Sequence, residues 1–189
     1  MNTFFTPAIL KIGEPDWIAK LQAYLESYGI TCQGESLYNI QKAEEKLGIR
    51  LPGEMREYYE HFGATSDSDF MYSLKPVAEF EYLSATNWSF VPLHFQPSEI
   101  NSMVVFAESP GNDPLCFDSK TNAIYLFSHD PIKKAKVFTD FSQYVVHELI
   151  ETERLLGDQV TDAAIEGLKT KYLAGDNNDV DYEFRRMKL

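Results

Sequence analysis

The sequence is poor in cysteine and has no long apolar run. Its two cysteines, Cys32 and Cys116, lie far apart, with no Cys-x-x-Cys pair and no histidine cluster beside them. This argues against a disulfide framework or a zinc site and predicts buried or inert thiols. No stretch approaches the roughly 18 consecutive apolar residues of a membrane span, and residues 1–15 lack the features of a signal peptide. We therefore expect a cytoplasmic protein that does not associate with membranes.

Basic residues are also scarce. The chain has 17 Lys and Arg against 29 Asp and Glu, a formal net charge of −12. Nucleic-acid binding requires Lys and Arg to meet phosphates, so this composition disfavours direct binding of DNA or RNA. The same charge would steer a basic protein toward the surface and accelerate encounter. The alternative is that the negative charge serves only to keep the protein in solution.

Catalytic motifs are missing as well. The sequence has no glycine-rich phosphate loop, no Gly-x-Ser-x-Gly elbow and no kinase-like set. In the segment His147-Glu148-Leu149-Ile150-Glu151, Glu151 replaces the second histidine of a zincin helix, so we interpret the segment as a solvated helix face. Ser128, His129 and Asp130 are adjacent on a predicted strand and cannot form a hydrolase relay, because neighbouring side chains point to opposite faces. We expect no catalytic residue, cofactor or metal.

What the sequence does contain begins with three amphipathic helices. The first is predicted over residues 14–28, the second from the N-cap Ser36 to Gly48, and the third after the link 49–52 up to Gly63. The short link forces the second and third helices to pack as one unit. The predicted inward faces are Trp17, Leu21, Tyr24, Leu25 and Tyr28, then Leu37, Ile40, Ala43 and Leu47, then Met55, Tyr58, Tyr59 and Phe62.

The pattern then changes to short apolar runs of strand length. Runs at residues 103–107, 115–118 and 123–127 are separated by the turn sequences 110–113 and 119–122. Two tight turns make these three strands antiparallel, because a parallel crossover needs a dozen or more residues. An earlier strand is predicted around residues 80–82, and a Lys-rich edge strand over 133–138.

Helical periodicity returns at residues 141–156 and again at 160–173, and the tail 185–189 is predicted to be loosely held. Helices that precede and follow a sheet, without βαβ repetition, define an α+β protein. We divide it into an N-terminal helical extension (1–30), a central α+β domain (31–156) and a C-terminal helix and tail (157–189).

Four segments, in order along the chain, resemble the signature of the SUKH superfamily. They are Glu44-Glu45-Lys46-Leu47-Gly48 leading through Leu51-Pro52 to an aromatic residue and Gly63, then Val105-Phe106-Ala107 with Gly111-Asn112-Asp113 and Leu115-Cys116-Phe117-Asp118, then residues 124–130, and then 138–144. The resemblance implies a twisted antiparallel sheet with helices on one side. It also implies a non-catalytic protein-binding domain.

Two functions follow from the resemblance. The first is a bacterial immunity protein that neutralises a basic toxin domain, such as a nuclease, and the second is a regulatory scaffold or adaptor of the cell-wall-assembly-regulator type. A third alternative is an enzyme that uses the region of Asp113, Asp118 and His129. The predicted partner-binding residues are carboxylates in or beside loops and two aromatic anchors: Asp67, Asp69, Glu79, Glu81, Trp88, Phe95, Asp113, Asp118 and Asp130.

Overall fold

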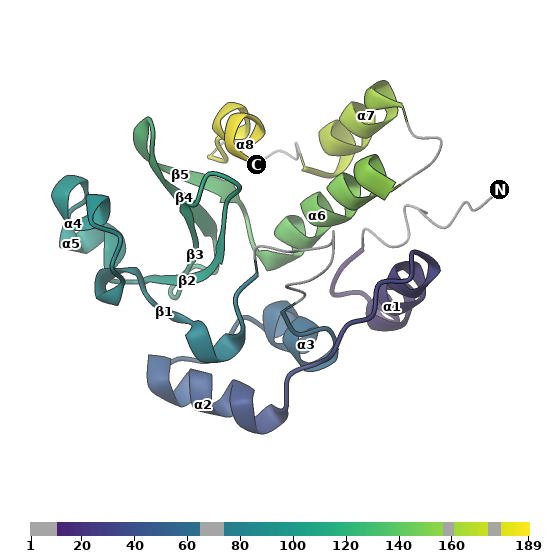
Figure 1. Ribbon diagram of the computed structural model, residues 1–189, viewed down its shortest axis with the longest axis horizontal. Helices are drawn as coiled ribbons and strands as arrows, with labels where there is room; N and C mark the ends of the chain where they lie inside the picture. Colours follow the sequence, from purple (N-terminus) through teal and green to yellow (C-terminus); the bar gives the residue numbers. More distant parts are fainter. Residues whose placement is uncertain (1–10, 65–73, 157–160, 174–178) are drawn as a thin grey trace.

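The computed structural model describes residues 11–64, 74–156, 161–173 and 179–189 (Figure 1). Its centre is a five-stranded antiparallel sheet in which the strands follow one another in chain order. The strands are β1 (Glu81–Tyr82), β2 (Met103–Glu108), β3 (Pro114–Asp118), β4 (Ile124–His129) and β5 (Ile132–Phe138). The predicted meander is therefore confirmed, with the Lys-rich strand at one edge.

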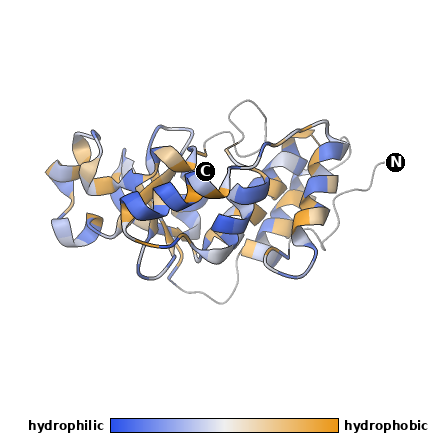
Figure 2. Ribbon diagram, turned by 90° about the horizontal axis from the view of Figure 1, so that it is seen from below, coloured by the Kyte–Doolittle hydropathy of each residue, from blue (hydrophilic) through white to orange (hydrophobic). Residues whose placement is uncertain are grey.

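Helices lie before, within and after the strands, so the α+β class is confirmed. They are α1 (Trp17–Ser27), α2 (Leu37–Leu47), α3 (Gly53–His61), α4 (Phe90–His94), α5 (Pro97–Ile100), α6 (Phe141–Leu156), α7 (Asp162–Leu173) and α8 (Tyr182–Lys188), with the 3-10 turns η2 (Val77–Glu79) and η3 (Leu83–Ala85). Hydrophilic and hydrophobic residues alternate within the turns of the longer helices, as expected for amphipathic elements (Figure 2).

The helical pair α2–α3 forms for the local reasons that its sequence suggests. The Ser36 hydroxyl accepts the Asn39 backbone N–H, and Gly48 ends α2 with a φ of 68°. Gly63 also has a positive φ, and a Cβ there would lie 2.2 Å from the Gln33 carbonyl oxygen, so only glycine fits. Leu37, predicted to face inward, is instead 55% exposed.

Helix α1 belongs to the same core as the helical pair and α6. Trp17 and Leu21 are buried, and the buried Glu153 carboxylate on α6 accepts the hydroxyls of Tyr24 at 2.8 Å and Tyr28 at 3.0 Å. Burial and the nearby Glu153 carboxylate raise the pKa of the Tyr24 phenol well above its ordinary value. The N-terminal helix is therefore fixed by polar as well as apolar contacts.

The sheet is covered on both faces, which corrects the expectation of helices on one side. Helices α3 and α6 lie on one side of it, and α4 and α5 lie on the other (Figure 1). The second face has its own buried cluster, which includes Val91, Phe95, Val105, Cys116 and Phe127. The physical reason is that β2 and β3 are almost entirely buried, and a strand that is apolar on both sides needs cover on both.

The C-terminal segment lies along the edge of β5, so the prediction of a loosely held tail is wrong. The Asp181 backbone N–H donates to the Lys136 carbonyl at 2.8 Å, and the buried Arg185 donates to the Val137 carbonyl at 3.2 Å. Asp181 also forms an ion pair with Lys133 at 2.5 Å. These contacts are made with β5, which is distant in the sequence, so a local sequence pattern cannot predict them.

Candidate protein-binding surfaces

The corner between α2 and α3 is built around Glu44. Its carboxylate accepts the backbone N–H of Leu51 at 3.0 Å and lies 3.6 Å from the Arg56 guanidinium, which also pairs with Glu60. The side chain is only 12% exposed. Glu44 therefore accepts a backbone hydrogen bond from the link that joins the helices. This contact gives the glutamate four residues before Gly48 a structural role.

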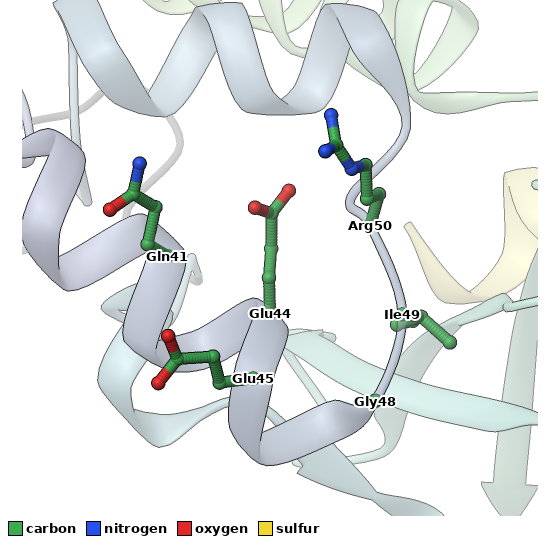
Figure 3. A pocket seen from close by; sticks show the side chains of 6 residues that line it. All are labelled: Gln41, Glu44, Glu45, Gly48, Ile49 and Arg50. Carbon is green, nitrogen blue, oxygen red and sulfur yellow. The ribbon is translucent and has the colours of Figure 1, made fainter.

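Two open hollows flank this corner, and in both the charged lining residues are mostly carboxylates. The first, of about 430 Å³, lies between the end of α2 and the link, and Figure 3 shows Glu44 projecting into it from α2 and Arg50 from the link. The second, of about 490 Å³, lies beside α3. We call their charged lining the helical-pair acidic surface; it consists of Glu44, Glu45, Glu54, Glu57 and Glu60 with Arg50 and Arg56.

The carboxylates of the helical-pair acidic surface differ in how far they are committed to the fold. The Glu45 side chain is 70% exposed and pairs with Lys42 at 3.2 Å across one helical turn. Glu54 is exposed in the first turn of α3, whereas Glu57 accepts the Trp17 indole N–H at 3.0 Å. Exposed pairs of this kind contribute little to stability, so these groups can meet a partner at little cost to the fold.

None of these glutamates was predicted as a binding residue. The signal was available, because Glu54, Glu57 and Glu60 are spaced by three and so lie on one face of a predicted helix. The carboxylates predicted from the sequence lie in or beside loops. Of those, Asp67 and Asp69 lie outside the described residues.

Glu79 and Glu81 lie in η2 and β1 and line neither of the two hollows. Glu79 is exposed at the end of η2 and Glu81 is partly buried in β1. The adjacent turn is tied to α2 because the Lys46 ammonium donates to the Ala78 carbonyl at 3.1 Å. They therefore form a second acidic location.

The two predicted aromatic anchors lie in the segment that covers the second face of the sheet. Phe95 is 8% exposed and packs edge-to-face on Phe127, with ring centroids 5.0 Å apart, so it is a core residue. Trp88 is partly buried, and the Lys75 ammonium lies 5.8 Å from its ring centroid. The large apolar side chain that this segment exposes most is Leu93, at 76% exposure.

Asp113 is internal and is paired with His129. It has no exposed surface; its Oδ1 accepts the His129 backbone N–H at 2.9 Å and lies 2.5 Å from the ring Nδ1. The Lys188 ammonium lies 3.7 Å from Oδ2. Asp118, at the other end of β3, accepts the Lys120 backbone N–H at 3.0 Å and shapes the following turn, whereas Asp130 is exposed. The structure thus joins Asp113 to His129 and leaves Asp118 apart.

The interpretation of residues 147–151 as a solvated helix face is wrong. His147 is 4% exposed, and its ring centroid lies 5.4 Å from that of Phe138 on β5. The side chains of Glu148 and Glu151 are 17% and 14% exposed. This part of α6 faces other elements because β5 and the ends of β2 and β3 lie against it.

Neither cysteine has the features of an activated nucleophile. Cys32 and Cys116 are free thiols, and burial raises the pKa of both, which disfavours the nucleophilic thiolate. Within the described ranges, no three His, Cys, Asp or Glu residues converge as metal ligands. In those same ranges, no helix is both long and apolar enough to cross a membrane.

The architecture and surfaces define a small α+β domain whose open hollows are acidic. Residues 34–147 match the family model described as SMI1 / KNR4 family (SUKH-1). The match covers more than half of the chain, so this protein belongs to that family. No curated protein and no solved structure gives a significant match to the chain.

Proposed function

We propose that this protein is a non-catalytic immunity protein that binds a basic toxin domain and neutralises it. The observation that carries the proposal is the helical-pair acidic surface, in which five carboxylates and two arginines line two open hollows. Sites for small molecules are typically enclosed and mostly apolar. Wide, polar hollows on the outside of two helices suit the basic surface of another protein.

Electrostatics supports this assignment in two ways. The formal charge of −12 favours rapid encounter with a basic partner, because complementary fields raise association rates. A nuclease needs Lys and Arg to hold phosphates, and an acidic protein surface can occupy those same groups. Arg56 pairs with the partly exposed Glu60 and so holds this carboxylate in place before binding, which lowers the entropic cost of association.

The carboxylates predicted from the sequence keep a part in this proposal. Glu79, Glu81 and Asp130, together with the half-buried Trp88, extend the partner contact beyond the helical pair, and Asp67 and Asp69 are proposed to do the same. In contrast, Asp113, Asp118 and Phe95 are buried, so they shape the surface from within.

The test is association with the protein encoded in the neighbouring reading frame, followed by stopped-flow kinetics over a range of ionic strength. We expect the association rate to fall steeply with salt, and the double variant E45K/E54K to associate about tenfold more slowly at low salt. The double variant E166K/E183K, at exposed positions of α7 and α8, is the matched control because it changes the net charge by the same amount. Equal rates for E45K/E54K and the control would place the interface elsewhere. Absence of any complex would overturn the function.

The adaptor function is favoured by one observation, the exposure of Leu93 beside partly buried aromatic residues. An apolar contact there would produce a complex that is insensitive to salt. In an adaptor, L93D abolishes binding and E45K/E54K leaves it intact; in an immunity protein, the two variants have the opposite ranking.

A further inference from the structure

A half-enclosed hollow lies between α6 and the adjoining ends of β2 and β3. Its volume is about 160 Å³, and it is lined by apolar groups from Pro110, Leu115 and Tyr144 together with the carboxylates of Glu108, Glu148 and Glu151. We call it the α6 pocket. It is well below the roughly 300–1,000 Å³ of typical small-molecule sites, so a nucleotide or a similar ligand is too large for it.

The three carboxylates of the α6 pocket are not equally neutralised. Glu108 forms an ion pair with Lys75, and Glu151 pairs with Lys169 and, at 2.6 Å, with Arg154. Glu148 differs from both. Its nearest ionic partner is the His147 ring nitrogen at 3.4 Å, and within the described part of the chain no Lys or Arg reaches it.

Glu151, which follows Glu148 on α6, is held in its charged form. Burial raises the pKa of Glu151, but hydrogen bonds from Lys169 and Arg154 lower it by more, and the net pKa is below the ordinary value. Glu148 and Glu151 are three residues apart and so lie on the same face of the helix. The buried His147 packs against Phe138 and fixes this part of α6 in position.

We propose that the α6 pocket receives one cationic side chain, Lys or Arg, from the partner protein. Such a side chain combines an apolar stem with a charged end, which matches a pocket lined by both apolar groups and carboxylates. The stem contacts Pro110, Leu115 and Tyr144, and the charged end lies at Glu148 and Glu151. The inference rests on the proposed function, which supplies the basic partner, and it adds a specific anchoring site to a surface otherwise recognised by overall charge.

Arg154 gives the proposal an internal check. Its side chain is 47% exposed and is bonded to Glu151, so it supplies the chain's own guanidinium at the pocket. Removing it in R154A frees one side of Glu151 and leaves the pocket more negative. We therefore expect a cationic probe to bind R154A more tightly than the unmodified protein; equal or weaker binding would count against the site.

The full chain is titrated with n-butylguanidinium and n-butylammonium, and with neutral n-butylurea as the uncharged analogue. Binding is monitored by two-dimensional NMR of the backbone amides. We expect saturable shifts at residues of α6 and at the start of β3 for the two cations and none for the urea. E148Q should weaken binding of both cations about tenfold, because a charged hydrogen bond is replaced by a neutral one.

The control variant is E166Q, an equivalent change on the exposed face of α7, which should leave probe binding unchanged. Equal thermal unfolding of E148Q and E166Q shows that the fold is intact. Absence of saturable shifts, or equal affinity in both variants, overturns the pocket.

The same variants are then measured in the complex with the toxin domain, which separates the two proposals. If the complex forms but E148Q does not weaken it, the pocket proposal fails and the immunity function stands. If the probes bind and no toxin complex forms, the proposed function fails and the assignment of the cation to a protein partner fails with it. Weakening of both probe and toxin binding by E148Q alone supports the inference.

Discussion

The carboxylates of this protein fall into an internal and an external group. Glu44 and Glu153 are largely buried and accept hydrogen bonds from the backbone or from tyrosine hydroxyls. Glu45 and Glu54 are exposed on the same helical pair. The formal charge of −12 counts both groups equally, but on the helical pair only the external group is free to meet a partner. Changes in the internal group should therefore cost stability, and changes in the external group should cost binding.

The largest effect is expected at Glu153. In E153A the hydroxyl of the buried Tyr24 and that of Tyr28 lose their shared acceptor, and a cavity remains. We expect the free energy of unfolding to fall by roughly 3 kcal/mol. Urea denaturation measures this loss, with E166A on α7 as the exposed control. A loss below about 1 kcal/mol would break the distinction between the two groups.

A smaller effect is expected at the corner of the helical pair. E44A leaves the Leu51 backbone N–H without its acceptor, which should cost about 1.5 kcal/mol of unfolding free energy. E45A, one residue further along the same helix, should change stability by less than about 0.5 kcal/mol. The pair sharpens the comparison because the two residue types are identical. Equal losses of unfolding free energy would mean that burial does not determine whether a carboxylate stabilises the fold.

The smallest effect concerns alkaline pH. Because the pKa of Tyr24 is raised in the folded protein, the unfolded chain releases this proton above pH ~10 while the folded chain retains it. The stabilisation is complete below pH 10 and is lost as pH rises, by about 1.4 kcal/mol per pH unit for one group. Urea midpoints measured between pH 9 and 11 should fall less steeply in Y24F. An unchanged slope would indicate that Tyr24 is solvated.

Local patterns predicted the longer elements. Apolar runs separated by turn residues predicted β2, β3 and β4 to within a residue or two, and the glycines Gly48 and Gly63 predicted where the helices end. Helices α4 and α5 were missed because each is about one turn long and exists through packing on the second face of the sheet. Their clue was the unbroken apolar character of residues 103–107, which indicates burial on both sides.

The sites were harder to predict because burial depends on distant partners. Asp113 sits in typical turn sequence, and nothing local indicates that His129 and Lys188 converge on it. His147 lies on a helix with charged neighbours, and its burial depends on Phe138 of another element. The acidic face of α3 was readable from its spacing, whereas the α6 pocket required the positions of three separate elements.

Helix α8 places a limit on how partners can be recognised. By occupying the carbonyls of Lys136 and Val137, the C-terminal segment caps the outer margin of the sheet. An incoming chain cannot extend the sheet there through backbone pairing, which would accept almost any sequence. At this edge, selectivity must then come from side chains that project outward.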